Sequence, residues 1–353
     1  MKKNRFVGII LAAGLSSRMG NPKPLLQLGG KPAIIKLIDS FYDAGVSKVF
    51  AVTGHNREMM EPFIRNAEAV YNPDYNDGMI TSIKSGLSAA LKYDDWDGAL
   101  FTPVDHALIR PYTIKLLINE FQPGMESVIF PAFNGRRGHP PLLSRGMAGK
   151  LCDMDGPWGA KRFLFSQGDA IRDVEVGSDD MFADMDTPED YETMKRLCAR
   201  EAPTALECEC MLRAERTPEK VVKHCRAVAE KALIIVDDAI CAGYKIDKSI
   251  VFAAAMLHDI CRTDQDHARA GAAVLDENGF PLVADVIADH MDIPDHKVEN
   301  IEEASIVYLA DKMTDGVADC TIEARISALP PDKREFGEAR LKKAIKIRDR
   351  IYK

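Results

Sequence analysis

The feature that most constrains this chain is the segment Phe6–Lys23, FVGIILAAGLSSRMGNPK. It opens with an apolar run rich in β-branched residues, which is typical of a buried strand in a parallel sheet. The run breaks into a loop that carries Gly14 and Gly20 and two cations, Arg18 and Lys23. Glycines let backbone N–H groups approach phosphate oxygens, and fixed cations neutralise phosphate charge, so the loop predicts nucleotide binding. Its spacing matches neither the dinucleotide fingerprint nor the Walker pattern.

The length and charge of the chain narrow the possible classes. The chain of 353 residues is longer than the chains that usually fold around one hydrophobic core, so we expect two domains. A net charge of −8 argues against nucleic acid or an anionic membrane as a partner, although a few local cations suffice for a nucleotide. The apolar start is too short for a signal peptide and includes the loop glycine, and no run approaches the length of a membrane span.

Eight cysteines lie mostly within helical patterns, and none has C-x-x-C spacing. Reduced thiols that act as small apolar residues explain them best, so we expect a cytoplasmic protein.

The two halves of the chain differ in pattern. Up to about Leu197, short apolar runs such as Val49–Thr53 and Gly98–Pro103 alternate with amphipathic segments. This alternation predicts an α/β domain with a mostly parallel sheet, whose ligands lie at the carboxyl ends of the strands. In this half we expect helices over Pro32–Ala44, Met79–Leu91 and Pro111–Glu120.

Beyond Thr217 nearly all of the sequence predicts helix, so the second domain is expected to be all-α. We expect a first domain over residues 1–200, a linker over 201–216 and a second domain over 217–353. The expected helices of the second domain are Glu219–Ala242, Lys248–His258, His267–Glu277, Pro281–His290, Glu302–Val317 and Glu335–Tyr352.

Two carboxylates accompany the glycine loop. Asp105 follows the apolar run that ends in Pro103 and Val104, where a divalent ion can bridge it to phosphates. Asp186 stands just before Thr187 and Pro188, which look like a helix start. Alone, each acidic segment is as easily structural, but together with Lys23 they favour function.

These segments, in this order, resemble the MobA-like nucleotidyltransferases, which have a Rossmann-like three-layer fold. The loop from Leu11 to Lys23 looks like their signature, and the segment Gly78–Leu87 looks like their base- and ribose-contacting segment. Gly138-His139-Pro140 resembles the acceptor-side motif of the molybdenum cofactor cytidylyltransferases. The resemblance covers roughly residues 5 to 197.

The resemblance implies transfer of CMP from CTP to a molybdopterin-type cofactor, with release of pyrophosphate. Arg18, Lys23 and Asp105 would be catalytic, and Asp105 and Asp186 would hold Mg²⁺. His139 and Pro140 would bind the acceptor, and a molybdoenzyme maturation protein is a further implied partner. The implied nucleotide-binding residues are Leu11, Ala12, Ala13, Gly14, Lys23, Ser82 and Gly86.

The choice of nucleotide depends on Ala13. The guanylyl branch tends to place a glycine at this position, so the methyl group of Ala13 would shrink the base pocket and favour a pyrimidine. Transfer from GTP, or to a sugar or alcohol phosphate, remains an alternative, because one scaffold hosts many acceptors.

The second half carries imidazoles and carboxylates on successive apolar helices, where such groups need partners that a divalent metal supplies. The arrangement resembles the HD superfamily of metal-dependent phosphohydrolases over roughly residues 217 to 330. This resemblance implies one metal on His224, His258, Asp259 and Asp311, and a second on His267 and His290. The metal would be a transition metal such as Mn, Fe, Ni or Co, and it would activate water to attack a phosphoester. A non-catalytic module that senses metal or nucleotide is the alternative for this half.

Overall fold

The computed structural model describes residues 5–15, 19–55, 57–93, 95–154 and 159–353. The chain divides into two compact units between Arg200 and Glu201. Residues up to Arg200 are called unit 1, and residues from Glu201 onward are called unit 2.

Unit 1 is built on a mostly parallel sheet. Its strands are β1 (Phe6–Ala12), β4 (Lys48–Thr53), β5 (Glu68–Tyr71), β6 (Gly98–Pro103), β7 (Val128–Phe133), β8 (Arg136–Arg137), β9 (Leu142–Ser144) and β10 (Ile171–Glu175). Within the described residues the strand order is β10-β7-β9-β6-β1-β4-β5, with β8 beside β7. β1 is parallel to β4 and β6, whereas β9 runs antiparallel to both of its neighbours. A separate hairpin pairs β2 (Gln27–Leu28) with β3 (Lys31–Pro32).

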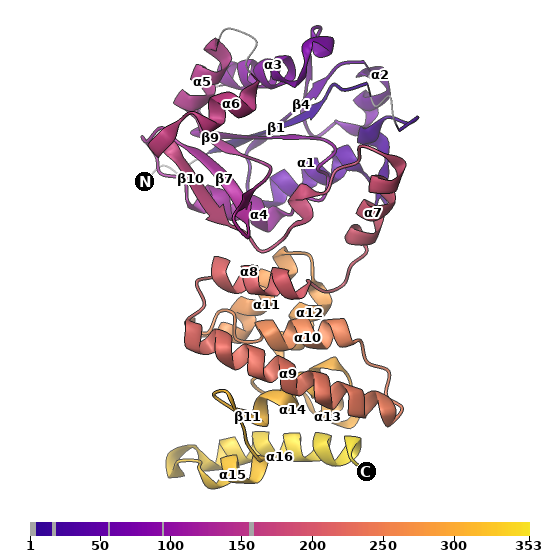
Figure 1. Ribbon diagram of the computed structural model, residues 1–353, viewed down its shortest axis with the longest axis vertical. Coiled ribbons are helices and arrows are strands. Elements are labelled where there is room, and N and C mark those ends of the chain that lie inside the picture. The colour runs from indigo at the N-terminus through magenta and orange to yellow at the C-terminus, as the bar shows by residue number, and fades with distance from the viewer. Residues whose placement is uncertain (1–4, 16–18, 56, 94, 155–158) are drawn as a thin grey trace. The chain divides into compact units, whose positions relative to one another are not determined.

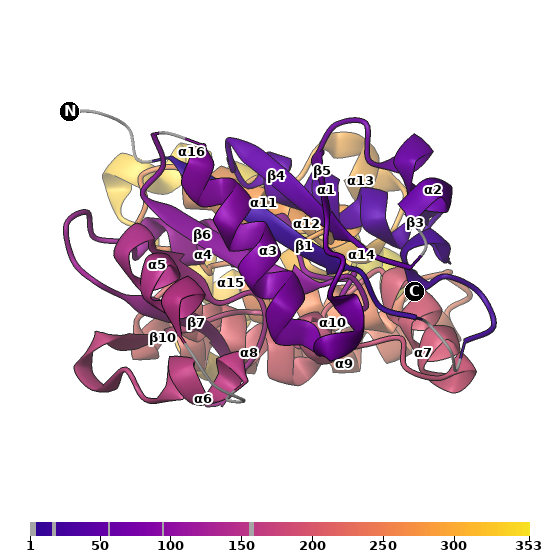
Figure 2. The ribbon, with the colours of Figure 1, turned by 90° about the horizontal axis from the view of Figure 1, so that it is seen from above.

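Helices cover both faces of this sheet. They are α1 (Ala33–Asp43), α2 (Arg57–Met60), α3 (Met79–Lys92), α4 (Pro111–Asn119), α5 (Arg145–Asp153), α6 (Ala160–Phe165) and α7 (Pro188–Cys198). Short 3-10 turns are η1 (Lys23–Leu25), η2 (Glu61–Phe63), η3 (Tyr75–Asp77), η4 (Gly168–Ala170) and η5 (Asp180–Phe182). α1 and α4 pack together on one face, and α3 and α5 pack on the other (Figure 1). Figures 1 and 2 both place α3 against β1 and β4. The expected α/β, three-layer architecture is confirmed.

The central strand β1 accounts for the apolar run at the start of the chain. Every residue of β1 is buried, as expected of a strand covered by helices on both faces. Its carboxyl end lies beside those of β4 and β6, since Leu11 pairs with Val52 and Pro103. The loops that follow these strands therefore meet at one edge of the sheet.

Unit 2 is helical apart from one short hairpin. Its helices are α8 (Ala205–Ala214), α9 (Glu219–Cys241), α10 (Lys248–Leu257), α11 (His267–Glu277), α12 (Pro281–Ala288), α13 (Asp295–Glu299), α14 (Glu303–Lys312), α15 (Ile322–Ser327) and α16 (Arg334–Ile351), with a 3-10 turn η6 (Pro331–Lys333). α9 packs along α10 and α14, and α10 also contacts α12, so these four helices surround the core of the unit.

The segment 201–216, expected to be a linker, belongs to unit 2. It forms α8, which is closed at its start by a capping box between Thr204 and Glu207. Cys208, Met211 and Leu212 are buried in the core of unit 2. The apolar face of a short helix was overlooked because Pro203 interrupts the preceding pattern.

The helix expected over Glu302–Val317 is also shorter than the sequence indicated. α14 ends at Lys312, and β11 (Thr314–Asp315) and β12 (Ala318–Asp319) form a hairpin. Gly316 has a φ of +61°, the left-handed conformation that a two-residue hairpin turn requires. The turn chemistry therefore ends the helical pattern one turn early.

Two further observations concern the whole chain. All eight cysteines are free thiols. Within the described ranges, no helix combines the length and the apolar character needed to cross a lipid bilayer.

Candidate active sites

The edge where β1 and β6 end opens into a pocket of about 440 Å³ in unit 1. This volume falls in the range typical of small-molecule sites, about 300–1,000 Å³. Leu11 to Leu15 form one wall, and Val104 and Asp105 another. The backbone N–H of Val104 donates to the Leu11 carbonyl at 3.0 Å, which holds the two loops side by side.

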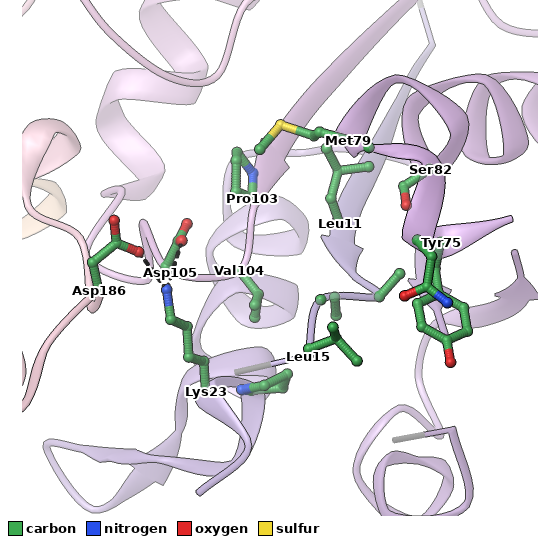
Figure 3. Close-up of a pocket in the computed structure, with 16 residues that line it drawn as sticks. Leu11, Leu15, Lys23, Tyr75, Met79, Ser82, Pro103, Val104, Asp105 and Asp186 are labelled. Carbon is green, nitrogen blue, oxygen red and sulfur yellow. Dashed lines mark hydrogen bonds and ion pairs between the residues drawn. The ribbon is translucent and has the colours of Figure 1, made fainter. Parts of the chain in front are cut away.

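One end of the pocket is charged (Figure 3). Lys23 Nζ lies 2.5 Å from Asp186 Oδ1 and 3.3 Å from Asp105 Oδ2. Burial lowers the pKa of Lys23, but the hydrogen bond to Asp186 and the charges of both carboxylates outweigh it and raise the pKa. Lys23 is therefore a fixed cation that neutralises two acidic groups.

The opposite end of the pocket is neutral. Tyr75 and Ser82 lie there in Figure 3, away from Lys23 and Asp105. The buried amide of Asn72 donates to Ser82 Oγ at 3.0 Å, which fixes the serine and leaves its proton for a ligand. An elongated molecule can thus place an anionic part at one end and a polar, planar part at the other.

Most of the residues implied to bind nucleotide line this pocket: Leu11, Ala12, Ala13, Gly14, Lys23 and Ser82. Arg18 lies outside the described residues. Gly86 does not line the pocket. It is buried in α3, where a Cβ would overlap Ile9 Cγ2 and lie 2.9 Å from Val52 Cγ2, so its role is close packing of the helix on the sheet.

His139 and Pro140 lie next to the charged end but do not line the pocket. The His139 ring is 4.8 Å from that of His106, the residue after Asp105. Burial, and then the neighbouring His106, lower the pKa of His139 to about 4. His139 is therefore neutral at physiological pH.

Sequence reasoning missed several residues near this pocket. Tyr75 and Asn76 line it from the turn-rich segment that precedes α3. Gly54 allows the close approach, because a Cβ there would lie 2.6 Å from the Ala13 carbonyl and 2.9 Å from Tyr75 Cβ. Asp184 belongs to the same acidic segment as Asp186, and its pKa is raised by burial and then by the charge of Asp186. The only signal for Gly54 was its place directly after a buried strand.

Unit 2 contains a second pocket, of about 500 Å³, whose floor is made of histidine and aspartate. The side chains come from α9 (His224), the end of α10 (His258 and Asp259) and α14 (Asp311). His224 Nε2 is 3.2 Å from Asp311 Oδ1, and His258 Nε2 is 3.9 Å from the same oxygen. The four residues implied for the first metal are thus brought together.

The two residues implied for a second metal lie beside them. His267 Nε2 and His290 Nε2 are 3.3 and 3.4 Å from Asp259 Oδ1, and 3.2 Å from each other. Asp259 therefore belongs to two groups of ligand atoms, one with His224 and His258 and one with His267 and His290. A carboxylate in this position can bridge two ions.

Backbone carbonyls orient three of these imidazoles. The Nδ1 atoms of His224, His258 and His290 lie 2.7–2.8 Å from the carbonyls of Gly316, Ala255 and Ile287, respectively. A carbonyl only accepts, so Nδ1 carries the proton in each ring. Nε2 of His258 and of His290 then presents a lone pair to the cluster. His224 Nε2 lies 3.2 Å from Asp311 Oδ1, and its hydrogen bond to that carboxylate raises the pKa of His224. A carbonyl at Nδ1 is the support that metal-ligating histidines usually have.

The charges of the cluster also suit a cation. Burial lowers the pKa of His258 to about 4, so this imidazole is neutral. Burial would raise the pKa of Asp259, yet His258, His290 and Arg262 outweigh it and hold the carboxylate ionised. Among the described residues, His258 Nε2 and Asp259 Oδ1 are buried without a hydrogen-bond partner. The neutral imidazole of His258, the ionised carboxylates and the unsatisfied buried atoms fit a divalent metal.

Two family models match the chain over these two sites. Residues 8–171 match the MobA-like NTP transferase domain, and residues 221–315 match the HD domain. The protein thus joins a nucleotidyltransferase domain of the MobA-like family to an HD domain, and both expected families are confirmed.

Individual relatives are similar to the N-terminal part. The molybdenum cofactor cytidylyltransferase of Escherichia coli K12 is 29% identical over 190 residues, which are 53% of this chain and 94% of that protein. A probable molybdenum cofactor guanylyltransferase of Bacillus cereus is 28% identical over 40% of this chain and 68% of that protein. A nucleotidyl transferase structure from Methanothermobacter is 20% identical, with a TM-score of 0.49, over 56% of this chain and 98% of that one.

Proposed function

We propose that unit 1 transfers CMP from CTP to a molybdopterin-type molybdenum cofactor and releases pyrophosphate. The observation that carries the proposal is the two-ended pocket, with Lys23, Asp105 and Asp186 at one end and Tyr75 and Ser82 at the other. The relative that this chain matches over 94% of its length is a cytidylyltransferase of this cofactor.

The chemistry is an in-line displacement. An oxygen of the acceptor phosphate forms a bond to the α-phosphorus, and the bond from this phosphorus to the bridging oxygen breaks, so that pyrophosphate leaves. The attacking phosphate is ionised at neutral pH, so it needs no general base. Lys23 neutralises phosphate charge, and Leu11 to Gly14 orient the nucleotide.

Asp105 and Asp186 would hold Mg²⁺. Asp105 Oδ1 is buried without a hydrogen-bond partner among the described residues, and two carboxylates at a phosphate pocket are a donor set that Mg²⁺ favours. When bound, the ion supplies further neutralisation of the triphosphate.

Ala13 supports CTP over GTP. It is 4% exposed and lines the pocket, so its methyl group would narrow this wall for a larger base. The guanylyltransferase relative keeps GTP as the second candidate. Nothing in the structure or the comparisons supports a maturation protein as a partner, and the proposal leaves it out. Free thiols throughout the chain keep the cytoplasm as the proposed compartment.

The test is release of pyrophosphate from each of the four ribonucleoside triphosphates with Mg²⁺, with and without molybdopterin cofactor. The proposal expects release with CTP and cofactor together. Release with GTP and cofactor would establish the second candidate, and release only with a sugar or polyol phosphate would overturn the cofactor assignment.

We propose further that unit 2 hydrolyses a phosphoester with a transition metal such as Mn, Fe, Ni or Co. Water adds to the phosphorus, the bond to the leaving oxygen breaks, and that oxygen takes up a proton. When bound, the metal activates the water and neutralises the phosphate. The cluster of four histidines and two aspartates carries this proposal; His224, His258, His290, Asp259 and Asp311 line the pocket, and His267 lies against Asp259.

Metal analysis and a screen of phosphoesters test the hydrolase. Bound metal with turnover supports it. Bound metal without turnover of any phosphoester would favour a sensor of metal or nucleotide instead.

A further inference from the structure

We propose that the pocket of unit 2 binds a diphosphate group. One phosphate would sit on the His–Asp cluster, and the second would bind at the start of α9 with Lys220 and Arg325. This inference rests on the hydrolase proposed above, because it takes the cluster as the seat of the scissile phosphate.

The first observation is the uncapped start of α9. The pocket is lined by Lys220, Val221 and His224, which belong to the first two turns of this 23-residue helix. Pro218 occupies the N-cap position and makes no side-chain cap hydrogen bond. The N–H groups of a helix start favour an anion. Those of Val221 and Val222 donate to the Pro218 carbonyl, so in the first turn the N–H of the lining residue Lys220 is the one that can meet an anion. The same pocket contains the unsatisfied, buried Nε2 of His258.

The second observation is an unused cation. Lys220 lines the pocket one turn before His224, is exposed, and has no acidic partner among the described residues. The other cations at the floor are already engaged, since Lys312 Nζ is 2.5 Å from Asp311 and Arg262 Nη1 is 3.5 Å from Asp259. Lys220 is therefore available to a ligand group beyond the cluster.

Arg325 reaches the same opening from the other side. Its Nη1 donates to the carbonyls of Asp311 and Thr314 at 2.8 and 3.1 Å, which fixes the guanidinium and leaves Nε and Nη2 for a ligand. Thr314 begins the hairpin whose Gly316 carbonyl accepts from His224, so α9 and Arg325 flank one pocket.

The charge balance favours a polyanion. The lining carries four cations, Lys220, Arg262, Lys312 and Arg325, against three carboxylates, Asp259, Asp311 and Asp315. Arg262 and Lys312 lie against Asp259 and Asp311, so Lys220 and Arg325 outweigh the remaining charge of Asp315. A monophosphate would contact only the His–Asp cluster. A second phosphate would use the start of α9 together with Lys220 and Arg325.

The experiment compares diphosphates with monophosphates as inhibitors of 4-nitrophenyl phosphate hydrolysis by the full chain at fixed free Mn²⁺. The pairs are pyrophosphate with orthophosphate, and CDP with CMP. We expect the diphosphate of at least one pair to inhibit about tenfold more tightly in the wild type, as a charged hydrogen bond predicts. A preference for pyrophosphate over orthophosphate would indicate that the pocket binds free diphosphate. A preference for CDP over CMP would indicate that it binds a diphosphate within a nucleotide.

Lys220→Ala should reduce this preference about tenfold, by weakening diphosphate more than monophosphate. Lys223→Ala, an exposed lysine of the same helix paired with Glu219, is the matched control and should keep it. Equal inhibition within both pairs, or the same preference in Lys220→Ala as in the wild type, would overturn the inference.

A binding measurement separates this inference from the hydrolase itself. If the metal-loaded protein turns over no phosphoester, the hydrolase proposal fails. The second phosphate site can still be tested by calorimetric titration of the protein with pyrophosphate. The titration uses the Lys23→Ala background, which weakens phosphate binding in unit 1. Tenfold weaker binding on adding Lys220→Ala supports the site, and unchanged binding overturns it.

Discussion

Lys23 lies between two carboxylates at the charged end of the unit 1 pocket. Its ammonium group is 2.5 Å from Asp186 Oδ1 and 3.3 Å from Asp105 Oδ2, so it offsets part of the charge of both carboxylates. In the proposed reaction the same ammonium group would neutralise phosphate charge on the nucleotide. The proposal therefore gives Lys23 one role before nucleotide binding, with the two carboxylates, and a second role after it, with the phosphates.

Replacing Lys23 by alanine should lower the rate of nucleotidyl transfer by at least about 100-fold, because a fixed charge at the reacting phosphates is lost. The measurement is pyrophosphate release with saturating Mg²⁺. Lys31→Ala is the matched control, since this exposed lysine pairs with Asp39 away from the pocket. Transfer at the wild-type rate in Lys23→Ala would contradict the proposed role.

His139 makes the stability of unit 1 depend on pH. Burial lowers its pKa from 6.5 to about 4. The unfolded chain therefore takes up the proton first as the pH falls, and the free energy of unfolding decreases between pH 6.5 and 4, by on the order of 3 kcal/mol. Above pH 6.5 this stability is fully present.

Tryptophan fluorescence can follow this effect, because both tryptophans, Trp96 and Trp158, belong to unit 1. Urea unfolding at several pH values should show a flatter pH dependence for His139→Gln than for the wild type. His55→Gln, at an exposed histidine of the same unit, is the control. Identical slopes for wild type and His139→Gln would rule out this origin of the pH effect.

Much of the candidate site could be predicted from single residues, because their positions follow from the neighbouring sequence. Lys23 and Asp105 follow apolar runs directly, so their place at the carboxyl edge of the sheet is implied by the strands themselves. Tyr75 and His106 could not be found in this way. Tyr75 reaches the pocket through its packing on Gly54, and the partner of His106 lies 33 residues further along the chain, so only the folded contacts reveal them.

At the scale of elements, Gly86 shows how one helix is held against the sheet. The resemblance implied a nucleotide contact, but the residue lies in α3 with no room for a side chain between it and Ile9 or Val52. Because Gly86 has no Cβ, α3 can lie close to the sheet. The same helix places Ser82 in the pocket.

Gly86→Ala should therefore destabilise unit 1 by about 2 kcal/mol through overpacking. Gly149→Ala is the matched control: this glycine lies in α5 with nothing within 4 Å of a Cβ, so alanine should be neutral or stabilise by up to about 1 kcal/mol. Urea unfolding followed by tryptophan fluorescence measures both. Equal stability of the two variants would contradict the packing role.

Elements with strong periodicity were predictable, and those set by turns or partners were not. The run that forms β1 and the amphipathic pattern of α3 are visible in the sequence alone. The antiparallel placement of β9 between β6 and β7 depends on long-range pairing that leaves no local pattern. The end of α14 is decided by one glycine turn, and α8 by an apolar face that only its core partners make evident.

For the molecule as a whole, the two pockets draw on separate parts of the chain. Within the described residues, the first is lined only by side chains from unit 1 and the second only by side chains from unit 2. The proposed activities should therefore be separable by single substitutions, one in each unit.

Asp105→Asn should abolish nucleotidyl transfer and leave phosphoester hydrolysis intact, and Asp259→Asn should do the reverse. Because Asp259 belongs to both groups of ligand atoms, its loss should also remove both metal ions of unit 2, as measured by elemental analysis. Asp43→Asn and Asp266→Asn, at exposed positions of the two units, are the controls and should retain both activities. If Asp259→Asn impairs transfer as strongly as hydrolysis while Asp266→Asn impairs neither, the two chemistries are coupled and do not belong to independent sites.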